Sequence, residues 1–126
     1  MIADILLVDD NCIQATTRKA ILARSGSVAV AGDGTQALAM LEQAGGIRPV
    51  GLVVTDHLMP GMNGPEFVAN LRMKFADLPV VVLSGLGDAE DEYQDLDVIF
   101  RMKPCPPEEL LSLVRSLLIQ PIGRTA

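Results

Sequence analysis

Short apolar runs alternate with longer, helix-periodic stretches along this chain. Each run is apolar at successive positions rather than at every second one, which is typical of strands covered on both faces of a sheet. The runs expected to form strands are Ile5 to Val8, Val28 to Ala31, Leu52 to Thr55, Val80 to Leu83 and Val98 to Phe100. Because strands that alternate with helices pair in parallel through right-handed crossovers, the pattern predicts an α/β fold, a single three-layer (βα)5 domain.

The stretches between these runs carry helix caps and apolar stripes. The expected landmarks are a cap at Asn11 or Asp10 for the first helix, a cap at Thr35 and a stop at Gly45-Gly46 for the second, Pro65 in the first turn of the third, and Pro107 near the start of the fifth. The expected inward residues are Ile13, Ala20 and Ile21, then Ala37, Leu38, Leu41 and Ala44, then Phe67, Val68, Leu71 and Phe75, and finally Leu110, Leu111, Val114, Leu117 and Leu118. The fourth stretch, Ala89 to Gln94, is short, acidic and poorly amphipathic, which predicts a shortened fourth helix.

Composition and charge narrow the class of protein. A formal net charge of −6 over 126 residues argues against nucleic acid or an anionic membrane surface as a direct partner. The first residues lack the basic region of a secretory signal, and no apolar run approaches the roughly 20 residues of a membrane span. Two cysteines and one histidine cannot build a zinc cage. We expect a cytoplasmic protein in which Cys12 and Cys105 are reduced thiols, with a disulfide or redox pair as the alternative.

Three carboxylates follow two of the apolar runs. Asp9 and Asp10 end the first run, and Asp56 ends the third. In the flavodoxin-like strand order 2-1-3-4-5, these two strands are neighbours, and ligands bind where the strand order reverses. Two like charges about 5 Å apart repel by roughly 3 kcal/mol at an effective dielectric near 20, so a divalent cation is expected to offset the cluster. An all-oxygen site of this kind suits Mg²⁺, whereas Asp10 alone would be a helix cap and Asp56 alone a solvated turn residue.

Three further features lie at the same predicted edge of the sheet. Met59-Pro60-Gly61-Met62-Asn63-Gly64 forms a sharp loop after Asp56, Ser84 ends the fourth run, and Lys103-Pro104 follows the fifth. A hydroxyl and an ammonium group there can bind phosphate oxygens. Taken singly, the loop is a simple strand-to-helix connection, the serine a loop-entry residue and the lysine a surface residue.

Together these elements resemble the receiver domain of two-component response regulators. The resemblance rests on Asp9-Asp10-Asn11, on Asp56 followed by Met59-Pro60 and Met62-Asn63-Gly64, on Ser84-Gly85, and on Phe100 before Lys103-Pro104. It extends from about Asp4 to Leu118, so we expect a receiver domain over residues 1–119 and a flexible tail over residues 120–126.

The resemblance implies a function for the acidic residues. Asp56 would be the phosphoacceptor, taking a phosphoryl group from a phosphohistidine on a histidine kinase or histidine phosphotransfer protein. Asp10, Asp56 and the backbone carbonyl of Leu58 would bind Mg²⁺ directly, with Asp9 acting through water and Mn²⁺ able to replace Mg²⁺. Such a domain is a monomer or weak dimer and a switch rather than an enzyme, although it promotes its own phosphorylation and dephosphorylation.

The resemblance also implies a switch. Lys103 would hold the phosphoryl group, Ser84 would hydrogen-bond it after activation, and Phe100 would then pack inward. The Lys103-Pro104 bond would be cis. The chain departs from the family in having 18 residues between Ser84 and Lys103, a shortening that is similar to receivers of hybrid histidine kinases and some stand-alone receivers.

Other residues near the predicted site have competing interpretations. Gln14, Ala15 and Arg18 form either a docking face for the kinase or a solvated helix face. His57 is expected to point away from Asp56, because strand neighbours face opposite ways. Two leucines, Leu58 and Leu86, occupy positions that tune hydrolysis in the family, and they predict a long-lived phosphoform.

Two other functions compete with the receiver switch. One is a receiver-like scaffold that binds partners without phosphorylation. The other is an aspartyl phosphatase, which would require an Asp-x-Asp pattern on the first strand and a cap domain.

Overall fold

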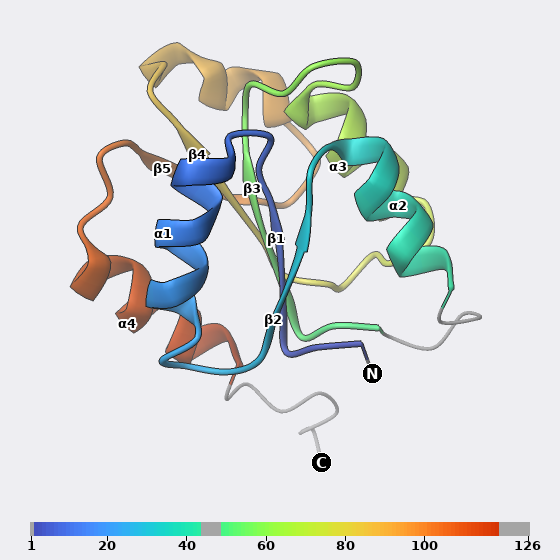
Figure 1. Cartoon of the computed structure of the whole chain (residues 1–126). Coiled ribbons are helices and arrows are strands. Elements are labelled where there is room, and N and C mark those ends of the chain that lie inside the picture. Colours follow the sequence, from blue (N-terminus) through green and yellow to red (C-terminus); the bar gives the residue numbers. More distant parts are fainter. Residues whose placement is uncertain (1, 44–48, 119–126) are drawn as a thin grey trace.

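The computed structural model describes residues 2–43 and 49–118 of the chain. A five-stranded parallel sheet in the order β2-β1-β3-β4-β5 lies at its centre (Figure 1). The strands are β1 (Ile5–Val8), β2 (Val28–Ala31), β3 (Leu52–Asp56), β4 (Val80–Ser84) and β5 (Ile99–Met102). The predicted strand order is confirmed. The last strand begins one residue later than predicted and continues two residues past Phe100.

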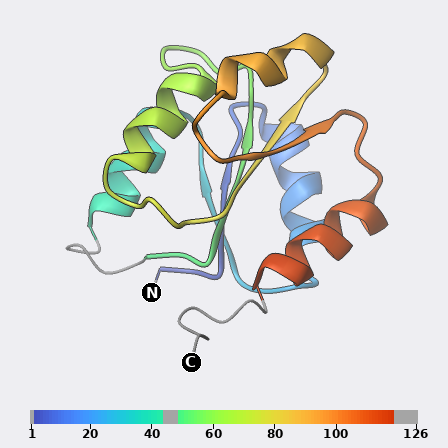
Figure 2. The ribbon, with the colours of Figure 1, turned by 180° about the vertical axis from the view of Figure 1, so that it is seen from behind.

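Helices cover both faces of this sheet (Figures 1 and 2). The helical elements are α1 (Cys12–Leu22), α2 (Gly34–Glu42), α3 (Gly64–Arg72), the 3₁₀ helix η1 (Gly87–Tyr93) and α4 (Pro107–Leu118). The helices α1 and α4 pack together on one face, and α2 and α3 on the other. The three-layer prediction is therefore confirmed.

Alternate strand residues enter two separate apolar cores. In β1, Leu6 and Val8 join the core under α2 and α3, whereas Ile5 and Leu7 join the core under α1 and α4. The strand residues Val53, Val80 and Val82 lie in the first core, and Val54, Val81 and Leu83 in the second. The helices add Phe67, Leu71 and Tyr93 to the first core and Leu22, Leu110 and Val114 to the second. Burial on both faces explains why the runs are apolar at every position.

The helix caps in the structure agree with the predicted caps only in part. Asn11 caps α1 by accepting a hydrogen bond from the backbone N–H of Gln14, and Asn63 caps α3. The prediction of Thr35 as the cap of α2 is wrong, because Asp33 accepts the hydrogen bond from the N–H of Gln36. The helix begins at Gly34, so Thr35 already lies within its first turn.

The predicted inward face of α1 is wrong for two of its three residues. Ile13 is 82% exposed and Ala20 is exposed, whereas Ile21 is partly buried, and Ala15 and Leu22 are buried. The side of α1 that faces the sheet also carries polar residues that reach the carboxyl ends of the strands, so apolar spacing alone assigned the wrong stripe.

The other apolar stripes agree well with the structure. The buried residues are Ala37 and Leu41 in α2, Phe67, Val68 and Leu71 in α3, and Leu110, Leu111 and Val114 in α4, with Leu38, Phe75, Leu117 and Leu118 partly buried. The predictions for Ala44, Gly45-Gly46 and the tail at 120–126 lie outside the described residues. The fourth helical element is short, as predicted, but it is a 3₁₀ helix.

Arg72, at the end of α3, forms hydrogen bonds to the segments that lead into two strands. Its guanidinium donates to the carbonyl oxygens of Phe75 and Leu78, at 2.9 and 2.7 Å, ahead of β4. It also donates to those of Leu96 and Asp97, at 2.8 and 2.7 Å, ahead of β5. One side chain therefore fixes the edge of the sheet opposite the predicted site.

Two sequence expectations concern the whole chain rather than one element. Cys12 and Cys105 are both free thiols, as predicted. Among the described helices, none has the length and apolar character needed to cross a membrane.

Candidate phosphoacceptor site

Three carboxylates meet at the carboxyl ends of β1 and β3. Asp9 follows β1 and Asp56 ends β3, and the pairing of Val8 with Thr55 places the two side by side. One oxygen of each of Asp9, Asp10 and Asp56 lies within 4.8 Å of the other two. Asp9 and Asp56 are buried, whereas Asp10 is exposed. The sheet order thus creates the predicted acidic cluster.

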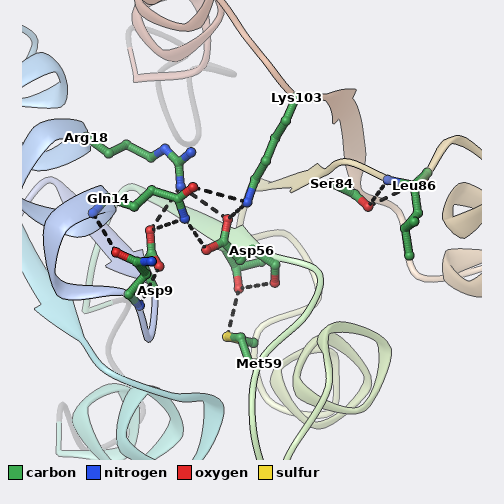
Figure 3. A network of polar contacts seen from close by, with 10 residues as sticks. Asp9, Gln14, Arg18, Asp56, Met59, Ser84, Leu86 and Lys103 are labelled. Carbon is green, nitrogen blue, oxygen red and sulfur yellow. Dashed lines mark hydrogen bonds and ion pairs between the residues drawn. The ribbon is translucent and has the colours of Figure 1, made fainter.

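Two cations offset this negative charge (Figure 3). The Lys103 Nζ lies 2.9 Å from Oδ1 of Asp56. The Arg18 Nη1 lies 3.1 Å from Oδ2 of Asp9 and 3.2 Å from Oδ1 of Asp56, so it bridges the two buried carboxylates. Lys103 reaches the cluster from the loop after β5, and Arg18 from α1.

Gln14 makes a second bridge between the same carboxylates. Its Nε2 donates to Oδ2 of Asp9 at 2.9 Å and to Oδ2 of Asp56 at 3.0 Å. Its Oε1 accepts from Lys103 at 3.5 Å. The backbone N–H of Asn11 donates to Oδ1 of Asp9 at 3.0 Å. Each described carboxylate oxygen of Asp9 and Asp56 therefore has a hydrogen-bond donor.

Sequence reasoning missed Gln14 and Arg18 as members of this site. The sequence predicts a docking or solvated face for them together with Ala15, but both side chains contact the carboxylates and Ala15 is buried. The signal was their spacing of four residues on the helix that directly follows Asp9, which places both on one side of that helix.

The protonation of Asp56 reflects its surroundings. Burial, aided by a hydrogen bond with Asp9, raises the pKa of Asp56 to about 6, although Lys103 acts in the opposite direction. At pH 7 about nine-tenths of the molecules therefore carry an ionised Asp56, which is the form that can act as a nucleophile.

Ser84 and Lys103 are linked through the backbone. The N–H of Lys103 donates to the carbonyl of Ser84 at 2.7 Å, and the Lys103-Pro104 bond is cis, as predicted. The hydroxyl of Ser84 accepts from the N–H of Leu86 at 2.9 Å. Figure 3 shows Ser84 and Leu86 to one side of the carboxylate cluster. Phe100 is partly buried, and its ring centroid lies 6.1 Å from that of Tyr93.

His57 is packed away from the carboxylates, as predicted. It is buried, and its Nδ1 lies 2.7 Å from the hydroxyl of Tyr93 in η1. Burial raises the pKa of Tyr93, which keeps this hydroxyl protonated. This contact ties η1 to the residue next to Asp56.

The loop after Asp56 turns sharply back toward β3. Gly61 has a φ of +79°, a conformation that favours glycine. The N–H of Gly64 donates to the carbonyl of His57 at 3.0 Å. The side chain of Leu58 is 65% exposed, so this loop borders the site without covering it.

The sequence that forms this sheet and its acidic cluster matches a known family. A family model described as the response regulator receiver domain matches residues 5–115. The chain belongs to this family. It is a receiver domain of two-component signalling and a switch rather than a classical enzyme.

Individual relatives agree with this assignment. The chain is 37% identical over 118 residues to the DNA-binding response regulator MtrA of Mycobacterium tuberculosis, covering 90% of this chain and 50% of MtrA. It therefore spans about half the length of the curated relatives it matches.

Solved receiver structures share the fold. The chemotaxis protein CheY4 of Vibrio cholerae superposes with a TM-score of 0.79 at 27% identity, covering 93% of this chain and 99% of CheY4. The receiver domain of a signal transduction histidine kinase from Syntrophus aciditrophicus gives 0.81 at 30% identity, covering 95% of this chain and 94% of that one. A chemotaxis protein and the receiver domain of a histidine kinase are thus similarly close in structure.

Proposed function

We propose that this receiver accepts a phosphoryl group on Asp56 from a phosphohistidine. The observation that carries this proposal is the bridging of buried Asp56 to Asp9 and Lys103 within a single cluster at the sheet edge. An oxygen of ionised Asp56 attacks phosphorus, the P–N bond to histidine breaks, and the ring nitrogen keeps the electron pair and takes a proton. The product on this chain is an acyl phosphate.

The residues at the cluster supply position and charge, which phosphoryl transfer needs most. Lys103 is placed to hold a phosphoryl oxygen, because its ammonium already contacts Asp56. Ser84 would donate its hydroxyl to the phosphoryl group once it leaves the N–H of Leu86. Phe100 would follow by packing inward against its neighbours.

The donor set fits Mg²⁺ or Mn²⁺. Three carboxylates with clustered oxygen atoms and an adjacent backbone carbonyl give the hard, oxygen-only surroundings that these ions prefer. Asp10, Asp56 and the carbonyl of Leu58 would hold the ion, with Asp9 acting through water. When bound, the ion supplies positive charge that offsets the carboxylates and the incoming phosphoryl group.

The partner of this reaction would be a histidine kinase or a histidine phosphotransfer protein. No direct contact with nucleic acid is proposed for this chain, because its net charge of −6 opposes the phosphate backbone. A cytoplasmic location and a monomer or weak dimer complete the proposal. The free thiols of Cys12 and Cys105 support the reducing compartment.

Self-dephosphorylation is expected to be slow. The side chains of Leu58 and Leu86 are 65% and 47% exposed and have no polar group that could orient an attacking water. We expect a phosphoform half-life of minutes or longer, measured by the decay of the phosphorylated mass. A half-life of seconds would contradict this reasoning.

The decisive experiment is incubation with phosphoramidate and Mg²⁺, followed by intact mass spectrometry. The wild-type chain is expected to gain one phosphoryl group, and EDTA should abolish the gain. Asp56→Asn should not be labelled. Asp91→Asn makes the same chemical change at an exposed position in η1 and should be labelled normally. Failure of the wild-type chain to gain mass would instead favour a scaffold that binds partners without phosphorylation.

A further inference from the structure

Arg18 and Gln14 use the same carboxylate oxygens that a divalent ion would need. We propose that Arg18 is a built-in cation that competes with Mg²⁺ for Asp9 and Asp56, so that the ion binds by displacing the guanidinium. This inference rests on the metal site of the proposed function and adds a residue that controls access to it.

The contacts place Arg18 within the site rather than at its rim. One guanidinium nitrogen, Nη1, contacts both Asp9 and Asp56, and the side chain is only 13% exposed. Gln14, one turn earlier on α1, repeats the bridge with Nε2. A charged donor and a neutral donor from one helix thus join the two buried carboxylates.

Lys103 has a different relation to the cluster. Its ammonium pairs with Oδ1 of Asp56, and within the described part of the chain it forms no ion pair with Asp9. Among the described residues outside the carboxylates, Arg18 and Gln14 are the side chains that contact both Asp9 and Asp56. The cation that spans the β1 and β3 ends is therefore Arg18, and Lys103 flanks the acceptor alone.

Simultaneous binding of Arg18 and the ion is unfavourable for two reasons. Mg²⁺ lies about 2.1 Å from its oxygen ligands and demands near-octahedral geometry, whereas Oδ1 of Asp56 already accepts from Arg18 and Lys103, and Oδ2 from Gln14. A guanidinium on the same oxygens would also bring like charges close together in a buried setting. Since a divalent ion carries twice the charge, it wins once its concentration is high enough.

The consequence is a Mg²⁺ concentration above which Asp56 becomes available for phosphorylation. Below a certain Mg²⁺ concentration, Asp56 stays locked in ion pairs with Arg18 and Lys103. Above it, Arg18 is released while Lys103 stays beside the acceptor. Removing Arg18 should therefore tighten metal binding, even though it removes a favourable contact from the protein.

The test is calorimetric titration of the full chain with MgCl₂ at constant ionic strength. Arg18→Met is expected to lower the Mg²⁺ dissociation constant at least tenfold. The matched control is Arg24→Met, which removes the same charge just after α1, where the arginine pairs with exposed Glu108 at 3.4 Å. The control should stay within twofold of the wild-type chain. Equal affinities for Arg18→Met and the wild-type chain would overturn the proposal.

A second readout separates displacement from a general effect of charge. In the ¹⁵N-labelled wild-type chain, the side-chain signals of Gln14 and Arg18 should shift with the same Mg²⁺ midpoint as the backbone signal of Asp56. If the backbone signal of Asp56 shifts on Mg²⁺ addition but these side-chain signals stay fixed, displacement is wrong, whatever the affinity of Arg18→Met. This measurement needs no variant, so it decides the question even if Arg18→Met folds poorly.

Phosphoramidate labelling distinguishes this inference from the proposed function. If the wild-type chain binds Mg²⁺ and is labelled on Asp56, while Arg18→Met has unchanged affinity, only the inference fails. If the wild-type chain neither binds Mg²⁺ nor gains mass, both fail.

Discussion

Asp56→Asn is expected to stabilise the chain at neutral pH while abolishing phosphorylation. Burial and the neighbouring Asp9 disfavour the ionised carboxyl and raise the pKa of Asp56 from 3.8 to about 6. Asparagine is neutral and nearly the same shape, and its carbonyl can still accept from Lys103 and Arg18. The variant therefore keeps these two contacts without the buried charge, but it loses the bond from Gln14 Nε2 to Oδ2, because an amide NH2 group takes the place of that oxygen.

The magnitude follows from the two pKa values. A difference of one pH unit between the native and unfolded pKa is worth about 1.4 kcal/mol, so the rise from 3.8 to about 6 corresponds to about 3 kcal/mol. The pKa of about 6 already includes the favourable contact with Lys103, so the lost hydrogen bond from Gln14 and the weaker contact with Arg18 are what reduce the net gain, to about 1–2 kcal/mol. For a domain of this size, that gain raises the melting temperature by about 3–8 °C.

The sign of the pH dependence is the sharper test. Between pH 3.8 and about 6 the native state holds the Asp56 proton more tightly than the unfolded chain does, so wild-type stability from this group falls as pH rises. The full cost is present above about pH 6, and about half of it remains at pH 5. The advantage of Asp56→Asn should therefore shrink as the pH is lowered.

The assay is thermal unfolding by circular dichroism in EDTA at pH 7.5 and pH 5. Asp91→Asn serves as the control, because its carboxyl is exposed and should change the melting temperature little at either pH. Equal or lower stability of Asp56→Asn at pH 7.5 would refute the reasoning. So would an advantage that stays constant or grows toward pH 5.

Three further substitutions test the internal contacts of the domain by denaturant unfolding. Phe67→Ala should cost about 3–5 kcal/mol, because Phe67 is fully buried in the core under α2 and α3; a loss below 1 kcal/mol would contradict this packing. Arg72→Met should lower the free energy of unfolding by about 2 kcal/mol, because four carbonyl oxygens lose the donor that Arg72 supplies. An unchanged denaturation midpoint would contradict this role of Arg72. Tyr93→Phe should cost about 1–2 kcal/mol through the buried bond to His57, and no loss would mean that water replaces it.

The sheet could be predicted from sequence because its signal is strong and local. Five continuous apolar runs are buried at every position only if they form strands covered on both faces, and the helical stretches between them require parallel pairing. That order alone brings Asp9 beside Asp56 and predicts the acidic cluster. The cis bond before Pro104 came instead from the family resemblance.

The errors concern positions where polar chemistry competes with apolar spacing. On α1, Ile13 was assigned inward because of its side chain, but that helix turns Gln14 and Arg18 toward the carboxylates and leaves Ile13 in solvent. Thr35 has a side chain that is common at helix caps, but the capping position depends on where the chain turns after β2. The structure places Asp33 at that position. Neither outcome can be derived without knowing how the helix axis sits on the sheet.

The four hydrogen bonds of Arg72 restrict which part of the domain can move. Arg72 fixes the segments that enter β4 and β5, at 2.7–2.9 Å from four carbonyl oxygens, whereas Ser84 and Lys103 lie at the far ends of the same strands. The two strands are thus fixed by Arg72 at their amino ends, and at their carboxyl ends they are joined to each other by the bond from the Lys103 N–H to the Ser84 carbonyl. Since η1 connects the carboxyl end of β4 to the amino end of β5, a displacement at Ser84 would therefore move η1 relative to the end that Arg72 fixes at Leu96 and Asp97, instead of sliding the strands past each other.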